Sequence, residues 1–197
     1  GALDASRSLG GDHVLGGDHV LGGDHVLGGD FRIATQEAVD IAVIDLPHIS
    51  NFTDFDSLGI EPDVYVRIVR NANELGRPDA IILPGSKNVI GDLAYLRQSG
   101  IADKILDLAH TSAAEIIGIC GGFQILGSEI ADPHKIESSG SSVEALSLLP
   151  VKTALATEKT LTRVEAKHMA SGCLVKGYEI HHGKTDSDGQ LPSVVRD

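Results

Sequence analysis

Short apolar runs that end in turn residues recur between residues 41 and 119. The runs at residues 41–46 (IAVIDL), 80–83 (AIIL) and 115–119 (EIIGI) are rich in β-branched side chains and too short for helices, which is typical of buried strands. Residues 63–70 (DVYVRIVR) alternate between apolar and polar positions, so we expect a strand with one buried face. The pattern therefore predicts four strands ahead of residue 120.

Helical spacing fills much of the chain between and after these runs. Apolar residues return every three or four positions in residues 88–98 and 101–109, and residues 123–130 follow as a further predicted helix. Strands that alternate with helices favour an α/β fold with a mostly parallel sheet covered by helices on both faces. Ligands bind such sheets at the carboxyl ends of strands, where we expect the two glycine-rich loops after residues 83 and 119.

The C-terminal third has a different pattern. Residues 146–153, 159–167 and 174–181 all have the composition of extended chain. We expect extra strands there, some of them antiparallel, and the sequence leaves their pairing open. One domain is therefore predicted for residues 37–197.

A perfect repeat precedes this domain. The unit GGDHVL occurs three times in residues 10–27 and places His13, His19 and His25 six positions apart, each after an aspartate. One interpretation is a metal-binding array. The other is a flexible leader, because paired glycines lose much entropy on ordering and each unit offers only two apolar residues to bury. We favour the second and assign residues 1–36 to a leader or linker.

Composition and charge argue against several classes of function. The 16 basic and 28 acidic residues give a formal net charge of −12 without a local basic patch, which argues against nucleic acid as a partner. No apolar run reaches the roughly 18 residues that a membrane span needs, and the N-terminus lacks the features of a signal peptide. The two cysteines, Cys120 and Cys173, form no CxxC pair. We therefore expect no metal site, no membrane contact and a reducing, cytoplasmic setting.

The most informative motif is GICGGFQ at residues 118–124. A cysteine between a buried strand and the start of a helix has the position of a nucleophile at a sharp strand-to-helix turn. The glycines around Cys120 permit that turn, the helix N-terminus favours the thiolate, and the backbone N–H of Gly121 is placed to stabilise an oxyanion. The alternative is an inert cysteine buried in a tight βα turn.

This motif resembles the elbow of class I (triad) glutamine amidotransferases, whose fold is a flavodoxin-like α/β sheet. The resemblance implies that Cys120 attacks the side-chain amide of glutamine, that Gln124 contacts the glutamine and that Gly121 donates to the oxyanion. The loop LPGSKN resembles the second oxyanion loop of that family, with the backbone N–H groups of Gly85 and Ser86 as donors. Taken alone, that loop favours an ordinary Pro-Gly turn before a capped helix; together with the elbow, the oxyanion loop becomes the favoured interpretation.

Longer segments narrow the resemblance to the glutamine amidotransferase domain of the cobyric acid synthase (CobQ) family. They lie at residues 45–56, 83–93, 146–150 and 177–185, and the similarity extends from residue 41 to the C-terminus. In that family the domain follows an ATP-dependent synthetase domain. The ammonia amidates adenosylcobyrinic acid a,c-diamide, a corrinoid, in cobalamin biosynthesis. The resemblance therefore implies glutamine, a synthetase domain and a corrinoid acceptor as partners, with ATP and Mg²⁺ confined to the synthetase domain and no cofactor here.

Alternatives within and outside this family remain. Cobyrinic acid a,c-diamide synthase and the glutaminase of cell-wall glutamate amidation share the elbow. A catalytically incomplete module that only binds or docks is a further alternative.

The general base is the open element of the predicted site. A cysteine nucleophile of this type needs a histidine within hydrogen-bond reach. His181 is one candidate, and Glu179 shares its face on an alternating strand. The family's own base belongs to a later strand of the type Tyr-Leu-His-Gly, which this sequence lacks, so we expect a domain that is incomplete at its C-terminus. We assign no catalytic step to His48 or Cys173.

Overall fold

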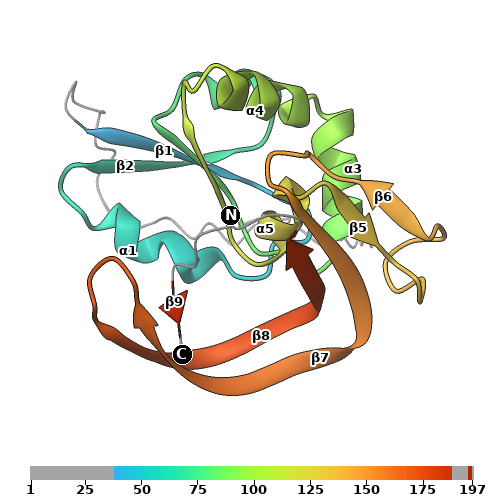
Figure 1. The fold of residues 1–197 in the computed structure, drawn as a ribbon. Coiled ribbons are helices and arrows are strands. Elements are labelled where there is room, and N and C mark those ends of the chain that lie inside the picture. Colours follow the sequence, from blue (N-terminus) through green and yellow to red (C-terminus); the bar gives the residue numbers. More distant parts are fainter. Residues whose placement is uncertain (1–37, 188–194, 197) are drawn as a thin grey trace, which may run out of the picture.

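The computed structural model describes residues 38–187 and 195–196, so the repeat and the assignment of residues 1–36 lie outside the described residues. Its first sheet has four parallel strands in the order β2-β1-β3-β4 (Figure 1). The strands are β1 (Val39–Ile44), β2 (Val64–Val69), β3 (Ala80–Leu83) and β4 (Glu115–Gly118). All four predicted strands are confirmed, and their order is that of the flavodoxin-like doubly wound folds.

The central strands bury both of their faces, which explains their continuous apolar runs. Ala42 and Ile44 of β1 point into the larger core cluster, whereas Ile41 and Val43 point into a smaller cluster on the opposite face. β3 divides its residues between the two clusters in the same way. Because side chains alternate along a strand, two cores on two faces follow directly from these sequences.

The principal helices lie on one face of this sheet. Leu93 and Leu96 of α3 (Val89–Gln98), Ile105 of α4 (Ile101–His110) and Ile125 of α5 (Gly121–Leu126) all belong to the larger cluster. The opposite face is covered by a 3-10 helix, η1 (Phe52–Phe55), and by α1 (Asp56–Gly59), with Phe55 as the buried contact. The expectation that both faces are covered is confirmed, and the larger helices lie on one of them.

Two predicted elements change at their ends, and one short helix was not predicted. The helix predicted for residues 123–130 begins earlier, at Gly121, and ends at Leu126; Glu129–Ala131 form a strand, β5, instead. The helix stops there because Gly127 is extended and lies directly against the backbone oxygen of Val151. The strand predicted for residues 146–153 starts only at Val151. The short helix α2 (Ala72–Leu75), capped by Asn71, was not predicted, because four residues hold too little periodicity to reveal it.

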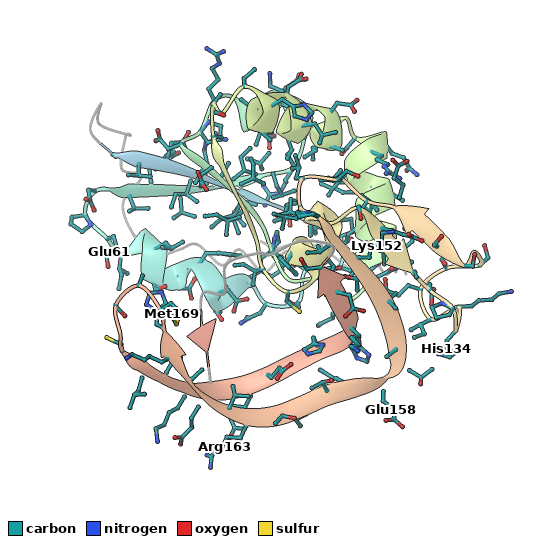
Figure 2. All side chains as sticks on the ribbon, viewed as in Figure 1. Glu61, His134, Lys152, Glu158, Arg163 and Met169 are labelled. Atoms are coloured by element: carbon teal, nitrogen blue, oxygen red, sulfur yellow. The ribbon has the colours of Figure 1, made fainter. Side chains whose placement is uncertain are left out.

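The C-terminal third forms a second, mixed sheet in the order β6-β5-β7-β8, with β9 (Val195–Arg196) paired to β7. β6 (Ser142–Glu144) is short, whereas β7 (Val151–His168) and β8 (Leu174–Ser187) form a long antiparallel hairpin that includes both remaining predicted strands. The expectation of extra, partly antiparallel strands is confirmed. The hairpin curves past the first sheet on the side of α1 and returns beside α5, with Glu158 and Arg163 on its outer side (Figures 1 and 2).

A register shift between Ala154 and Lys159 bends this hairpin. Gly183 lies opposite the shift with a φ of 91°, and a Cβ there would lie 2.5 Å from the backbone oxygen of Ala154. Only glycine tolerates this backbone conformation and this approach together. The bend brings the residues just before Gly183 onto the edge of the first sheet that carries Cys120.

The larger core cluster yields a first prediction. Leu93 is 1% exposed and Leu174 is 79% exposed. We expect Leu93→Ala to lower the free energy of unfolding by about 2–5 kcal/mol, because it removes buried methyl groups and leaves a cavity. Leu174→Ala should change it by less than about 0.5 kcal/mol. Urea unfolding of both variants measures the difference, and equal effects would contradict the assigned core.

Candidate active site

Cys120 lies between β4 and α5 in a conformation that few residues adopt. Its φ is 48° and its ψ is −105°, and its side chain is exposed. A non-glycine residue in such a region costs about 1–3 kcal/mol and persists only when the surrounding structure holds it there. The structure thus has the sharp strand-to-helix turn that the motif predicts, with the sulfur on the surface.

Two glycines hold this turn against the loop that follows β3. A Cβ on Gly122 would lie 2.0 Å from the backbone oxygen of Leu83, and one on Gly121 would lie 2.8 Å from the backbone nitrogen of Ser86. Ile119 also donates its N–H to the Leu83 oxygen at 2.9 Å. The two loops are therefore in direct backbone contact, and any side chain on Gly122 would push them apart.

The three residues predicted to donate backbone N–H groups to an oxyanion lie close together. The Cβ position of Gly85 is 3.9 Å from the Cβ of Cys120, and Ser86 contacts Gly121 as described above. Within residues 38–187, the backbone N–H groups of Gly85, Ser86 and Gly121 have no hydrogen-bond acceptor. N–H groups without acceptors beside an exposed thiol are candidates for stabilising a negative oxygen. The structure thus brings together Cys120 and all three of the predicted oxyanion residues.

The hairpin strand β8 lies across the other side of the elbow. The Cys120 Sγ is 3.9 Å from the backbone oxygen of Ile180, and the Gln124 Nε2 donates to the backbone oxygen of His182 at 3.1 Å. Gln124 is 7% exposed. The amide nitrogen of Gln124 therefore joins β8 to α5. A contact between Gln124 and glutamine stays a prediction.

His181 lies on β8 with both ring nitrogens engaged. Nδ1 is 2.8 Å from the backbone oxygen of Gly183, and Nε2 is 2.7 Å from a carboxylate oxygen of Glu179. Both partners are acceptors, so the ring satisfies both only when both nitrogens carry protons. Neither ring nitrogen is hydrogen-bonded to Cys120 in the described chain. The predicted pairing of Glu179 with His181 is present.

Two carboxylates lie beyond the N-terminus of α3. Glu137 is half-buried and accepts the backbone N–H of Ile90 at 3.0 Å. Burial raises the pKa of Glu137, although the N–H groups at the start of α3 favour its ionised form. Asp132 is fully buried, and burial opposes the ionisation of its carboxyl group. The N–H groups of residues 136–138 and the Ser138 hydroxyl donate to this carboxylate. Their effect outweighs that of burial, so the pKa of Asp132 is lowered. These carboxylates organise the loop beside α3 and do not reach Cys120 through any hydrogen bond in the described chain.

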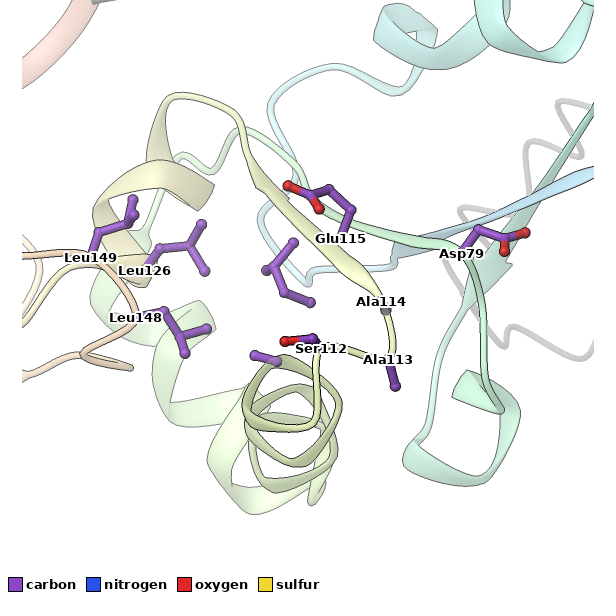
Figure 3. Close-up of a pocket in the computed structure, with 10 residues that line it drawn as sticks. Asp79, Ser112, Ala113, Ala114, Glu115, Leu126, Leu148 and Leu149 are labelled. Carbon is purple, nitrogen blue, oxygen red and sulfur yellow. The ribbon is translucent and has the colours of Figure 1, made fainter. Parts of the chain in front are cut away.

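A pocket of the described residues lies elsewhere. It has a volume of about 560 Å³ and is lined mainly by alanine and leucine side chains, with Asp79 and Glu115 at its edge (Figure 3). Glu115 begins β4, so this pocket opens at the opposite end of the strand from Cys120. Its lining carries no cysteine or histidine. In the part of the chain that the structure describes, no three His, Cys, Asp or Glu side chains are grouped to hold a metal, and no helix is long and apolar enough to cross a membrane.

The family of the chain follows from comparison with known proteins. Residues 40–196 match the CobB/CobQ-like glutamine amidotransferase domain, and the chain belongs to this family. The Adenosylcobalamin biosynthesis bifunctional protein CobDQ of Leptospira interrogans is 52% identical over 160 residues, which cover 81% of this chain and 18% of that protein. The cobyric acid synthase of Clostridium novyi is 47% identical over 155 residues, or 79% of this chain and 30% of that protein.

The cobyric acid synthase of Geobacillus thermodenitrificans is 48% identical over 160 residues, which cover 80% of this chain and 32% of that protein. The chain thus spans about a third or less of the length of these relatives.

Solved structures confirm the fold. A glutamine amidotransferase crystal structure has a TM-score of 0.58 at 17% identity, with 79% of each chain covered. The PurLQS structure from Thermotoga maritima also has a TM-score of 0.58, at 19% identity, with 81% of this chain and 74% of that chain covered. The glutamine amidotransferase-like fold expected from the elbow motif is therefore correct.

The contact between the two loops yields a second prediction. Gly122→Ala would place its Cβ on the Leu83 carbonyl, so the loops must separate. We expect a loss of at least about 1–3 kcal/mol of unfolding free energy, as for other overpacked sites. Gly177→Ala is the matched control, because no atom lies within 4 Å of its Cβ position. Thermal unfolding of both variants tests this, and a Gly122→Ala protein as stable as the control would contradict the contact.

Proposed function

We propose that this domain hydrolyses the side-chain amide of glutamine with Cys120 as the nucleophile and supplies ammonia to a synthetase domain. The observation that carries the proposal is the strained Cys120 beside three backbone N–H groups without acceptors in the described chain. A strained backbone conformation that the surrounding structure holds in place is typical of active sites. Membership in the family supports the same activity.

The chemistry follows from the arrangement of these groups. The Cys120 thiolate attacks the amide carbon of the glutamine side chain, and a carbon–sulfur bond forms. The carbonyl oxygen becomes negative and is held by the N–H groups of Gly121, Gly85 and Ser86. The carbon–nitrogen bond then breaks, the nitrogen takes a proton and ammonia leaves. Water hydrolyses the remaining glutamyl thioester, which releases glutamate and restores the thiol.

We propose that His181 is not the general base of this reaction. Its two ring nitrogens face the Gly183 oxygen and the Glu179 carboxylate, which fixes the ring on β8. The family resemblance instead implies a base on a later strand of the type Tyr-Leu-His-Gly. His181 and Glu179 instead stabilise the bend that lays β8 against the elbow.

For the whole protein we propose the activity of its cobyric acid synthase relatives. The ammonia would amidate carboxylates of a corrinoid in cobalamin biosynthesis. The proposed corrinoid is adenosylcobyrinic acid a,c-diamide. ATP and Mg²⁺ would act in the synthetase domain, and this domain would need no cofactor. The identity to two cobyric acid synthases over about four fifths of the chain supports this version over the related a,c-diamide synthase or a cell-wall glutaminase.

Ammonia release from L-glutamine tests the proposal. We expect Cys120→Ala to abolish release by at least about three orders of magnitude relative to the parent protein, because the covalent route needs the sulfur. Cys173 is also a free, exposed cysteine, so Cys173→Ala is the matched control and should retain the parent rate.

Two variants decide which residues act in the reaction. Release that persists in Cys120→Ala would exclude this nucleophile. His181→Ala separates the two candidate bases: a change of less than about tenfold agrees with a positioning role, whereas a loss as large as that of Cys120→Ala would make His181 the base.

A further inference from the structure

A buried carboxylate behind the candidate oxyanion loop has no role in the mechanism above. Asp92 lies on α3 and is 0% exposed. Its Oδ1 accepts the Nδ1 of His48 at 2.8 Å and the backbone N–H of His48 at 3.2 Å, and its Oδ2 accepts the Ser86 hydroxyl at 2.5 Å. A buried carboxylate is tolerated only when its oxygens are satisfied, and these donors satisfy both.

Asp92 is not needed to cap α3, the helix on which it lies. Asn88 accepts the N–H of Gly91 at 2.9 Å, and Glu137 accepts the N–H of Ile90. The first turn of α3 is therefore already satisfied by two other side chains. All the groups that donate hydrogen bonds to the Asp92 carboxylate come instead from the loop after β1 and the loop after β3. The carboxylate thus joins two loops at the switch point of the sheet, where such folds bind their ligands.

The same two loops are also joined by backbone hydrogen bonds. Ile49 and Ser86 form an antiparallel bridge, flanked by Ser50 N–H to Gly85 oxygen and Lys87 N–H to His48 oxygen, both at 2.8 Å. In this kind of pair, the N–H of the central residue points away from the partner strand. The Ser86 N–H is therefore turned away from the β1 loop and toward Gly121, whose Cβ position it contacts.

The side chain of Ser86 fixes that peptide from the other side. Its hydroxyl donates to Asp92 and accepts the N–H of Asn88 at 3.0 Å. The orientation of one candidate oxyanion donor, the Ser86 N–H, thus depends on a hydroxyl that is held in turn by a buried carboxylate and a half-exposed histidine.

We propose that Asp92, His48 and the Ser86 hydroxyl form a positioning network that sets the direction of the Ser86 N–H toward the oxygen of a γ-carbonyl group bound at Cys120. This inference rests on the proposed function. None of the three side chains contacts the reacting atoms in the proposal. Their role is to hold the loop after β3 in the orientation that the reaction needs.

Two alkylating reagents separate this role from a purely structural one. A chloroketone analogue of glutamine is anchored by its amino-acid part, so its carbonyl oxygen lies where the oxyanion forms; the thiolate displaces chloride and forms a thioether. Iodoacetamide alkylates the same sulfur by loss of iodide without that anchoring. The ratio of the two rate constants at Cys120, followed by peptide mass spectrometry, reports the oxyanion donors, and the ratio at exposed Cys173 is the internal reference.

We expect Ser86→Ala and Asp92→Asn to lower the ratio at Cys120 by at least about tenfold, with the iodoacetamide rate changed less than about twofold. His48→Ala should lower the ratio as well, and His48→Asn should restore it, because the asparagine amide places an N–H donor near the position of Nδ1. His48 is about half exposed, so its variants retain the fold even if Asp92→Asn does not. Ser99→Ala, the same change at the far end of α3, is the control and should leave the ratio unchanged.

Each outcome decides between the two proposals. A parent ratio at Cys120 no higher than that at Cys173 would overturn the glutamine site and this network with it. A high parent ratio that Ser86→Ala and His48→Ala leave unchanged would overturn the network alone. A loss in His48→Ala without recovery in His48→Asn would also contradict it, since the hydrogen bond to Asp92 would then not be the cause.

Discussion

The contact between the backbone turns after β3 and β4 is the constraint on which the candidate site depends. Gly122 lies so close to the Leu83 oxygen that no side chain fits between them, and Ile119 donates to the same oxygen. Parallel pairing of β3 with β4 brings the two turns to one edge of the sheet. The close approach then does two things at once: it holds Cys120 at a positive φ, and it brings the loop at residues 84–87 beside the sulfur.

The rest of the molecule supports this contact from three sides. The two core clusters fix β3 and β4 in the sheet. Asp92 and the bridge at Ile49 hold the loop after β3 from behind. The bent hairpin lays β8 over the elbow through Gln124 and the Cys120 sulfur. A rigid site of this kind is expected where backbone N–H groups, which cannot be re-aimed by a rotamer change, stabilise developing charge.

Much of the fold was predictable because its elements carry local signals. The buried runs of β1 and β3 and the apolar spacing of α3 and α4 are patterns that a single segment reveals. The hairpin was less predictable. Its strands were expected, but their pairing depends on the register shift opposite Gly183, which is a contact between distant residues. The predicted end of α5 was wrong because Gly127 contacts Val151, which lies 24 positions away in the chain. No local sequence pattern indicates that contact.

The site divides in the same way. Cys120 and Gly121 could be proposed because a glycine-rich turn after a buried strand marks them in the sequence, whereas Gly85 and Ser86 were proposed from the family resemblance. Asp92 was missed, although it gave one signal: it is a charged residue on the apolar face of a predicted helix, between Ile90 and Leu93. Its partners His48 and Ser86 lie in other segments, so their meeting is a property of the fold. The hydrogen bonds of His181 to Gly183 and Glu179 depend likewise on the bend in β8, which the sequence does not reveal.

The most direct test of this account is a crystal structure of the protein after Cys120 has been alkylated by a chloroketone analogue of glutamine. The account predicts that the ketone oxygen of the adduct lies about 3 Å from the backbone nitrogens of Gly121 and of Gly85 or Ser86. An adduct on Cys120 whose oxygen points to solvent, with those N–H groups unengaged, would contradict the claim that the two turns together form the oxyanion site.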